Sequence, residues 1–146
     1  MGNAKKYTGD QLRIGMTATR VKTITRQDID SFGEISTDIN PMHFDEEYAS
    51  KTQFGQCIAH GLICLSFCNA ILGMELPGLG AVLMSQESTF RAPVFVGDVI
   101  TAKGEVVDII YKEKKNFYIV KIKLTATNQD GVVVVDSIAT VMPAKE

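Results

Sequence analysis

The chain has 146 residues, of which 45% are hydrophobic and 22% charged, and its formal net charge is −2. These values are typical of one globular domain with its own hydrophobic core, and we treat residues 1–146 as a single domain. The slightly negative charge argues against sequence-independent binding to nucleic acid. The longest apolar run, residues 62–72, is too short to cross a bilayer, so we expect neither a membrane span nor a membrane partner.

Cysteine usage and the first residues indicate the compartment. Lys5 and Lys6 are not followed by an apolar segment, which argues against a signal peptide. The three cysteines, an odd number, lie in or near apolar sequence at Cys57, Cys64 and Cys68. Buried free thiols are therefore expected rather than disulfides or metal ligands. This favours a reducing compartment and a cytoplasmic location.

The N-terminal part is predicted to contain one strand and one helix. Residues 1–10 are polar, and we expect them to be loosely ordered. β-Branched residues in near-alternation predict a strand over residues 18–25. Thr25 then has the properties of a helix N-cap, with Asp28 as its capping-box partner. Apolar residues at helical spacing predict a short helix that ends near Ser36.

The middle of the chain is predicted to contain the main buried helix. Asp45 can cap a short helix of its own. After a loop over residues 52–56, residues 61–72 form the most apolar helical segment, and a helix that is apolar nearly all round is normally buried. Gly73 is predicted to lie just beyond the end of this helix, and Pro77 prevents its continuation.

The C-terminal half is predicted to form strands, over residues 80–90, 99–110, 117–128 and 132–142. Residues 112–115 and 128–131 are expected to be hairpin turns. One face of each later strand is apolar and the other is polar, so the sheet needs an element that covers its apolar face. The helix that begins at Gly61 is the natural candidate. The sequence therefore predicts an α+β fold, with a curved antiparallel sheet around a central helix.

The segment Ser36–Asp45 is the strongest candidate for a site. It places the carboxylate of Asp38 and the imidazole of His43 five residues apart, with Asn40 and Pro41 between them. Proline fixes its own φ angle and pushes the preceding residue into an extended conformation. The chain therefore bends between the acid and the imidazole.

Three segments resemble the MaoC-like (R)-specific enoyl-CoA hydratases. They are Ser-Thr-Asp-Ile-Asn-Pro-Met-His at residues 36–43, Ala-His-Gly at 59–61, and Phe-Arg-Ala-Pro-Val-Phe-Val-Gly-Asp at 90–98. The resemblance extends from about Leu12 to Met142, and its Asp-x-Asn-Pro-x-His core is the most specific part. Members of that family have the hot-dog fold, in which a curved antiparallel sheet wraps around a long central helix.

The resemblance implies the reversible hydration of trans-2-enoyl thioesters to (R)-3-hydroxyacyl thioesters. In that family the acid and the imidazole of the motif hold the reacting water, roles that fall here on Asp38 and His43. Asn40 would support the site, and the backbone N–H of Gly61 would bind the thioester oxygen. The substrate would be an acyl-CoA or acyl-carrier-protein thioester. It would bind in a tunnel along the subunit interface of a homodimer or higher homo-oligomer.

The chemistry itself favours these residue types. Adding water to a conjugated thioester needs deprotonation of the water, a proton at C2 and stabilisation of negative charge on the thioester oxygen. An Asp–His pair can exchange protons with one bound water, with either residue as the base. An N–H at a helix N-terminus can stabilise the enolate oxygen, and a glycine there allows close approach. The reaction requires no metal and no organic cofactor, so we expect neither.

Other polar residues near these motifs are interpreted more simply. His60 is expected to be a structural, supporting residue that orients the loop before the apolar helix. Arg91 is a candidate for contact with the phosphates of coenzyme A, as are Lys112, Lys114 and Lys115. Surface charge is the ordinary explanation for all four basic side chains.

Two other functions are considered. A hot-dog acyl-CoA thioesterase, or an acyl-carrier-protein dehydratase of the other type, usually places an acid on the central helix. Residues 61–72 contain no acid, and only Ser66 and Asn69 are polar there. The His-Phe-Pro signature of that second dehydratase type is also missing, since Asp45 follows Phe44. A non-catalytic acyl-thioester-binding protein is compatible with the sequence, but the presence of both an acid and an imidazole disfavours it.

Overall fold

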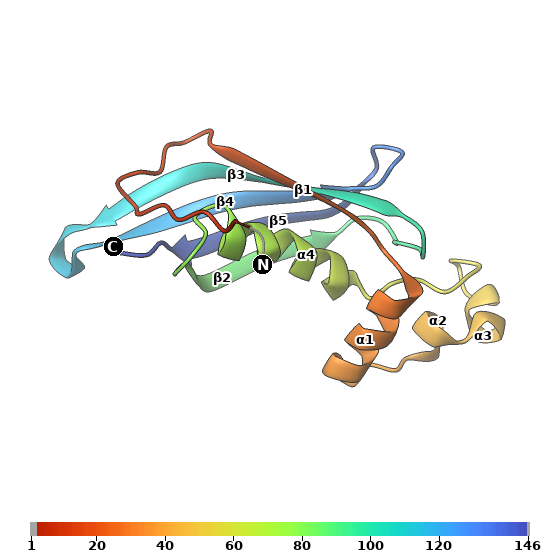
Figure 1. Ribbon diagram of the computed structural model, residues 1–146. Helices are drawn as coiled ribbons and strands as arrows, with labels where there is room; N and C mark the ends of the chain where they lie inside the picture. The colour runs from red at the N-terminus through yellow and green to blue at the C-terminus, as the bar shows by residue number, and fades with distance from the viewer. Residues whose placement is uncertain (1–2, 146) are drawn as a thin grey trace.

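A five-stranded antiparallel sheet curves around one long helix in the computed structural model, which describes residues 3–145 (Figure 1). The strands are β1 (Thr17–Thr23), β2 (Val82–Phe90), β3 (Val99–Lys112), β4 (Phe117–Thr127) and β5 (Val133–Met142). The helices are α1 (Arg26–Ser36), α2 (Pro41–Phe44), α3 (Glu46–Ser50), α4 (Gly61–Met74) and the 3-10 turn η1 (Glu113–Lys115). The sheet order is β1-β3-β4-β5-β2, so β1 and β2 are the edge strands.

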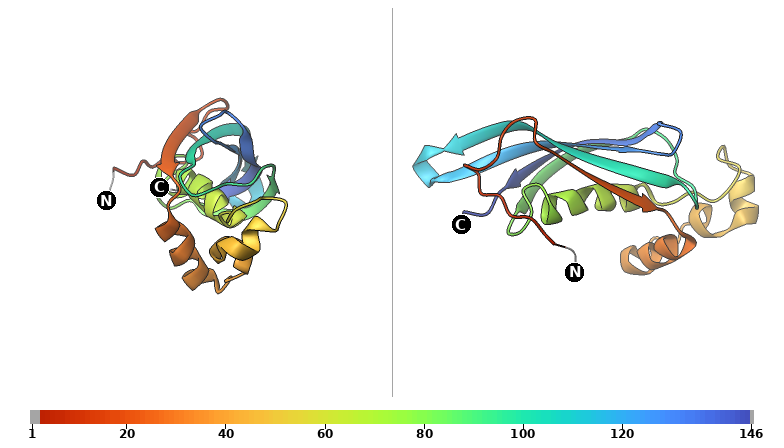
Figure 2. Two further views of the ribbon diagram at one scale, coloured as in Figure 1. Left: turned by 90° about the vertical axis from the view of Figure 1, so that its right-hand side faces the viewer. Right: turned by 45° about the horizontal axis from the view of Figure 1, so that its top comes forward.

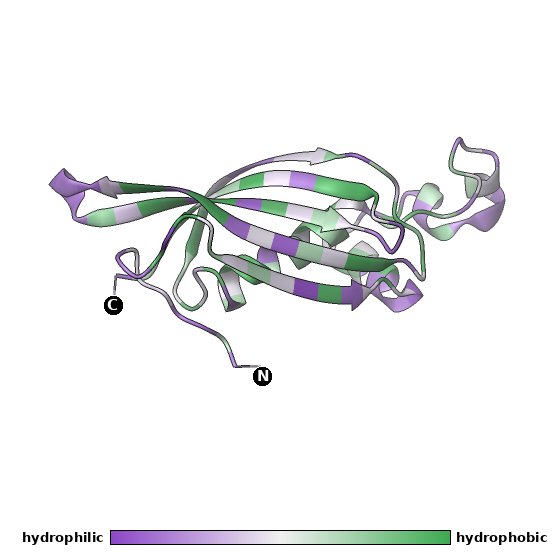
Figure 3. Cartoon of the chain, turned by 90° about the horizontal axis from the view of Figure 1, so that it is seen from above, coloured by the Kyte–Doolittle hydropathy of each residue, from purple (hydrophilic) through white to green (hydrophobic). Residues whose placement is uncertain are grey.

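The core lies between the concave face of the sheet and α4, as the alternating strands predicted. Alternate residues of β3 and β4 point inward and are fully buried, among them Ile100, Val106, Val120 and Leu124. Figure 3 shows the alternation as bands of hydrophobic and hydrophilic residues along the strands, and the end-on view in Figure 2 shows the sheet curving around α4. The predicted α+β fold with a central helix is confirmed.

The predicted capping of α1 is also confirmed. Thr25 is the N-cap and its side chain accepts from the N–H of Asp28, while the Asp28 carboxylate accepts from the Thr25 N–H. The preceding strand ends two residues earlier than predicted, at Thr23. Ile24 still bonds across to the segment that precedes β3, with its N–H to the carbonyl of Asp98 and its carbonyl to the N–H of Gly97, before Thr25 begins the helix cap. Sheet and helix are therefore joined by one extended residue and a cap.

The C-terminus of α4 differs from the prediction. Gly73 lies inside the helix, which continues to Met74, and Glu75 is the C-cap. The N–H groups of Glu75 and Leu76 both bond to the carbonyl of Ile71, at 2.9 and 2.8 Å. Nothing lies within 4 Å of a Cβ built on Gly73, so no close approach requires glycine there. The prediction that Gly73 terminates the helix is wrong.

The N-terminal segment is attached to the body of the protein where the structure describes it. Lys5 donates to the carbonyl of Met74 at 2.8 Å, and Tyr7 donates to that of Pro77 at 2.9 Å. The expectation that residues 1–10 are loosely ordered is therefore not met at Lys5 and Tyr7; residues 1 and 2 lie outside the described residues. These bonds fasten the segment beside the end of α4.

The helices α1, α2 and α3 project beyond one end of the sheet, next to the start of α4 (Figure 1). The β3–β4 hairpin with η1 lies at the opposite end of the sheet. The sheet thus presents one end, and the N-terminus of α4, to the projecting helices. Among residues 3–145, no helix combines the length and the apolar character needed to cross a lipid bilayer.

A matched pair of isoleucine substitutions tests this packing. Ile71 of α4 is fully buried against the sheet, whereas Ile35 at the end of α1 is 83% exposed. We expect Ile71→Ala to lower the free energy of unfolding by about 2–5 kcal/mol, because it removes buried methyl groups and leaves a cavity. Ile35→Ala should change it by less than about 0.5 kcal/mol. Urea denaturation of both variants measures this; equal losses would contradict the packing.

Candidate functional site

The first segment of the site begins where α1 ends. Thr37 is the C-cap and adopts the left-handed conformation, with φ 62° and ψ 11°. This conformation is costly for a β-branched residue and is maintained only when the surroundings enforce it. The next residue, Asp38, donates its N–H to Ser36 Oγ at 3.2 Å. The chain thus reverses direction immediately before the acid.

Asn40 connects the acid to the imidazole. Its N–H donates to Asp38 Oδ1 at 3.2 Å, and its own side-chain oxygen accepts from the N–H of Met42 at 3.1 Å. It is therefore the N-cap of α2, with Pro41 in the first position of that helix, where proline is favoured. His43 lies on this single helical turn and its side chain is buried. The geometry is compatible with the supporting role predicted for Asn40.

A second segment, residues 58–61, is held by the loop that follows β2. The N–H of Ala59 donates to the carbonyl of Val94 at 2.7 Å. That loop is itself closed by Asp98, whose carboxylate accepts from the Phe95 N–H at 2.9 Å and from the Gln129 side chain at 2.8 Å. The third motif noted in the sequence, residues 90–98, therefore positions the second motif.

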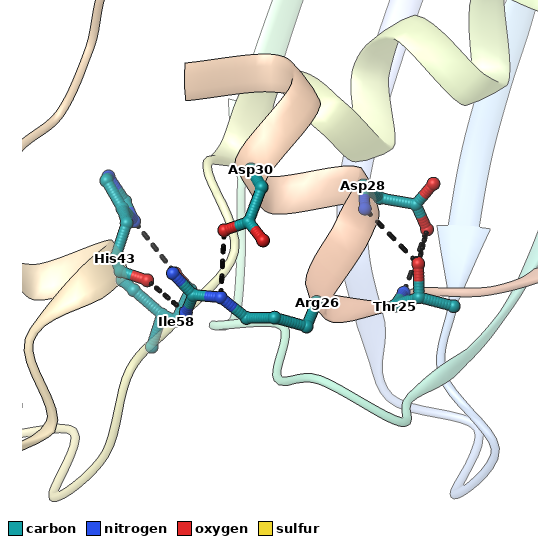
Figure 4. A network of polar contacts seen from close by, with 6 residues as sticks. All are labelled: Thr25, Arg26, Asp28, Asp30, His43 and Ile58. Atoms are coloured by element: carbon teal, nitrogen blue, oxygen red, sulfur yellow. Dashed lines mark hydrogen bonds and ion pairs between the residues drawn. The ribbon is translucent and has the colours of Figure 1, made fainter. Parts of the chain in front are cut away.

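The two segments exchange hydrogen bonds through their histidines. His43 Nδ1 lies 2.8 Å from the carbonyl of Ile58, as Figure 4 shows, and His60 Nε2 lies 2.9 Å from the carbonyl of Asp38. A carbonyl oxygen can only accept, so each of these nitrogens carries a proton. The two rings stack between the segments, with centroids 3.8 Å apart and planes inclined by 27°. We call His43 and His60 the crossed histidine pair.

This arrangement fixes the lone pairs available for chemistry. With its proton on Nδ1, a neutral His43 has an unprotonated Nε2 that can accept a proton. One ring nitrogen of each histidine and one carboxylate oxygen of Asp38 all lie within 4.8 Å of one another. The Asp38 side chain is exposed and uses Oδ1 for the Asn40 N–H. An acid and an imidazole thus lie close enough to bind one water molecule jointly.

The same three side chains also have the composition of a cation site. A metal ion requires donors whose lone pairs converge on one point. The two imidazoles are stacked with their planes inclined by 27°, and one nitrogen of each already bonds to a backbone carbonyl. Each imidazole therefore has one ring nitrogen left to bind a ligand. The expectation that no metal takes part stays a prediction.

Gly61 is the first residue of α4, and its N–H has no acceptor among the described residues. His60 is the N-cap but makes no side-chain capping bond, so the helix N-terminus is open. A Cβ at position 61 would lie 2.9 Å from Cδ1 of Phe90, which explains the glycine. The unpaired N–H and the helix dipole together suit a developing negative charge.

An open cavity of about 460 Å³ begins at Gly61. Its lining is mainly apolar and includes Ile58, Leu62, Phe90 and Val135. Asp38 and His43 do not line it in the single chain, but Ile58 does, and the Ile58 carbonyl is the partner of His43. The cavity has the size and apolar character of a small-molecule site. The cavity is therefore one residue, Ile58, away from the imidazole of His43.

Arg26 is a site residue that the sequence did not indicate. Its side chain donates to the backbone carbonyl of His43 at 2.9 Å and to Asp30 at 2.9 Å (Figure 4). Its guanidinium carbon also lies 5.0 Å from the ring centroid of Phe44. These contacts fasten α2 to α1. In the sequence Arg26 is only a basic residue after an N-cap, and no local pattern distinguishes it from an ordinary surface arginine.

The basic residues considered for phosphate contact fall in two places. Arg91 lines the cavity and is half-exposed, with Asp136 a distant partner at 3.5 Å. Lys112, Lys114 and Lys115 lie in the β3–β4 hairpin, at the end of the sheet away from α1–α3 (Figure 1). Within one chain, only Arg91 is near the cavity.

Fold and site together define a hot-dog protein with a candidate acid–base centre beside an open helix N-terminus. The sequence profile of a family described as "MaoC like domain" matches residues 11–128, which is most of the chain. The chain belongs to this MaoC-like family, as the three motifs predicted.

Relatives of known name cover nearly the whole chain. A 3-hydroxybutyryl-CoA dehydratase from Methylorubrum extorquens is 38% identical over 94% of this chain and 85% of its own length. An (R)-specific enoyl-CoA hydratase from Rhodospirillum rubrum is 39% identical over 93% and 92%. The solved R-hydratase PhaJ1 from Pseudomonas aeruginosa in the unliganded form superimposes with a TM-score of 0.89 at 31% identity, over 98% of this chain and 89% of that one. The predicted hot-dog fold is confirmed.

The three cysteines are free and buried, as predicted. Burial raises the pKa of the Cys64 thiol to about 12 and that of the Cys68 thiol to about 11. The pKa of Cys57 is raised as well, first by burial and then by the neighbouring Glu46 carboxylate. A nucleophilic cysteine needs the opposite shift, so these thiols are unsuited to covalent catalysis.

The raised pKa values predict inert thiols in the folded protein. At pH 8, a thiol with a pKa of about 11 is ionised to on the order of one part in a thousand. We expect a disulfide reagent such as DTNB to react with less than one thiol equivalent in the native protein within minutes. The same protein in denaturant should release three equivalents, which serves as the control. Rapid reaction of the native protein would contradict the burial.

Proposed function

We propose that this protein is an (R)-specific enoyl-CoA hydratase, acting in reverse as a 3-hydroxyacyl-thioester dehydratase. One observation carries the proposal. A carboxylate oxygen of Asp38 and a ring nitrogen of His43 lie within 4.8 Å of each other and of a ring nitrogen of His60, and His60 directly precedes Gly61, which lines an apolar cavity and whose N–H has no acceptor among the described residues. These are the parts needed for adding water to a conjugated thioester, and the named relatives support this reaction class.

In the proposed reaction, Asp38 and His43 hold one water molecule beside C3 of the substrate. The water oxygen bonds to C3 while one of its protons passes to this pair. The π electrons of the C2–C3 bond move onto the thioester, which becomes an enolate. The pair then returns a proton to C2, and the C=O re-forms. Water is added in full and both side chains regain their starting state.

Gly61 stabilises the enolate in this proposal. Negative charge develops on the thioester oxygen, and the Gly61 N–H at the start of α4 is free to donate to it. A preorganised donor of this kind is most effective where charge appears only in the transition state. Glycine at position 61 also lets the Phe90 ring pack against the start of α4, where a Cβ would lie 2.9 Å from Cδ1 of Phe90.

The apolar cavity is proposed to receive the thioester arm or the acyl chain. Arg91 at its lining is half-exposed and is the best-placed basic residue for a phosphate of the carrier. Both coenzyme A and acyl carrier protein present such a phosphate. Some relatives are named for coenzyme A substrates, and a relative from Solanum lycopersicum is named a 3-hydroxyacyl-[acyl-carrier-protein] dehydratase. We propose a thioester of one of these two carriers as the substrate.

The thioesterase alternative lacks a suitable side chain on α4. Asn69 is the polar residue that faces inward, and its amide exchanges two hydrogen bonds with Gln86, both 2.8 Å long. Gln86 continues the network to the buried Ser137 at 3.0 Å. Asn69 is therefore engaged in joining the helix to β2 and β5. Neither a general base nor a nucleophile for hydrolysis is available at this position.

Hydration of crotonyl-CoA tests the proposed reaction. We expect the wild-type protein to remove the enoyl-thioester absorbance and to restore it from (R)- but not (S)-3-hydroxybutyryl-CoA. Replacing Asp38 with Asn removes a proton acceptor of nearly the same shape, and kcat should fall at least about 100-fold. The measurement is the initial rate of absorbance change.

Asp130→Asn is the matched control for this experiment. Asp130 is an exposed acid in the β4–β5 turn, far in sequence from the site, and its replacement should leave kcat unchanged. Thermal unfolding of both variants separates chemistry from stability. The proposal is wrong if wild-type protein leaves the enoyl signal intact. Release of free thiol from acyl-CoA would instead support the thioesterase.

We also propose that two copies assemble through β2. This edge strand exposes Val82, Leu83 and Met84, each about half accessible, and its outer hydrogen-bonding groups face no other strand of the described chain. An apolar unprotected edge favours pairing with another chain. A second copy of the same edge gives a closed two-fold dimer, since antiparallel pairing is self-complementary. The cavity lined by Phe90 at the end of β2 would then lie near the interface.

Charge placed on each edge strand tests the dimer. Leu83→Lys on β2 should convert a dimer into monomers, because the lysine would have to be buried between the two edges. Val21→Lys on β1, where Val21 is 63% exposed, is the matched control and should leave the dimer intact. Size-exclusion chromatography with light scattering gives the mass of each variant. A monomeric wild type, or a monomer formed equally by both variants, would refute the assignment.

The proposed location is cytoplasmic, which rests on the three free, buried cysteines. Relatives from Solanum lycopersicum and Arabidopsis thaliana carry the word mitochondrial in their names, which describes those proteins. The cytoplasm and the mitochondrial interior both keep thiols reduced, so the cysteines are compatible with either.

A further inference from the structure

We infer that His60 is a positioning residue, whose ring holds both Asp38 and His43 in their reactive arrangement; this rests on the proposed hydratase function. The sequence suggested only that His60 orients the loop before α4. In the structure it contacts the two proposed catalytic residues directly and precedes the third, Gly61, in the chain. His60 therefore contacts two of the three proposed catalytic residues with its side chain and adjoins the third along the backbone.

The bond to Asp38 acts where the backbone is under strain. His60 Nε2 donates to the Asp38 carbonyl at 2.9 Å, just after Thr37 in its left-handed conformation. A strained conformation persists only when its neighbours enforce it. Without this donor, the carbonyl would lose its partner and the Asp38 peptide could rotate. The carboxylate would move with it, and a displacement of about 1 Å costs on the order of 100-fold in rate.

The stacking contact acts on His43. The two imidazoles lie face to face at 3.8 Å, and the ring of His43 cannot turn toward His60 without a clash. Phe32 and Phe44 enclose His60 on other sides, with ring centroids 5.0 and 5.7 Å away. His60 is therefore held rigidly itself and limits the rotation of the His43 ring. The Ile58 carbonyl then selects the tautomer of His43.

The two nitrogens of His60 have unequal surroundings, which makes the inference testable. Nε2 has its carbonyl acceptor, while Nδ1 is buried and has no partner among the described residues. Glutamine places its side-chain nitrogen close to the position of Nε2, whereas the shorter asparagine reaches only the position of Nδ1. His60→Gln therefore keeps the donor to Asp38, and His60→Asn removes it at similar polarity. His60→Phe keeps a stacked ring but has no donor.

The wild-type protein provides the first test, which is independent of catalysis. Nitrogen-15 NMR of histidine-labelled protein distinguishes the two tautomers of each of the two histidines. We expect His60 with its proton on Nε2 and His43 with its proton on Nδ1. A His60 that carries its proton on Nδ1 alone could not donate to Asp38, and this result would overturn the inference even if the protein hydrates no enoyl thioester.

The variants provide the second test, with crotonyl-CoA as the substrate. Residues that lie behind a reactive group and orient it typically contribute about 10- to 100-fold to activity. We expect kcat to fall by this factor in His60→Phe and His60→Asn. KM should change by less than about threefold, since the cavity lining is untouched. His60→Gln should recover most of the loss caused by His60→Asn. The chemical shifts of the Asp38 and Asn40 amides should also move from their wild-type values, and they should move less in His60→Gln than in His60→Asn.

Ser137→Ala is the stability control, because Ser137 is buried and hydrogen-bonded but belongs to the network between β2 and β5. It should lower the melting temperature without lowering kcat. The inference is overturned if all three His60 variants keep kcat within twofold of wild type. It is equally overturned if kcat follows melting temperature alone, with no recovery in His60→Gln. An inactive wild type would refute the proposed function, and the amide resonances would still decide the role of His60.

Discussion

Two hydrogen bonds from histidine side chains to backbone carbonyls hold the candidate site together. His43 donates to Ile58 and His60 donates to Asp38, so each segment supplies one donor and one acceptor to the other. Both segments are irregular at these points, and their carbonyls have no helix or strand partner to satisfy them. Both bonds are partly buried, so each segment helps to satisfy polar groups of the other.

The sheet makes this exchange possible by fixing where the second segment lies. Val94, after the end of β2, accepts from Ala59, and Asp98 closes the same loop before β3 begins. The first segment is fixed from the other side, because α1 is capped at Thr25 and Arg26 binds the His43 carbonyl. A rigid scaffold thus holds two loops whose own residues have little tendency to order. This is the usual division between a packed core and a functional surface.

Features that depend on neighbouring residues could be predicted from the sequence. The capping box of Thr25 and Asp28 and the start of α4 at Gly61 involve residues within one turn of helix, and the strand alternation follows from burial of one face. The contacts that failed prediction are long-range. The attachment of Lys5 to Met74 depends on segments that meet only in the fold. Arg26 and the stacking of His60 on His43 have the same origin, since no local pattern encodes a contact across 17 residues.

The composition of α4 follows from the charge that the proposed reaction creates. An enolate carries negative charge on the thioester oxygen, and a carboxylate on the nearby helix would repel it. An open N-terminus with a free N–H attracts the same charge without a titrating group, and Gly61 provides one. The acid lies instead on the other segment, at Asp38, where the proposed reaction uses it to hold the water rather than the oxyanion. Asn69, the polar residue of α4 that faces the sheet, is already hydrogen-bonded to Gln86 of β2. The proposed acid and the proposed oxyanion donor thus lie on two segments, and the hydrogen bonds of the crossed histidine pair fix the position of one segment relative to the other.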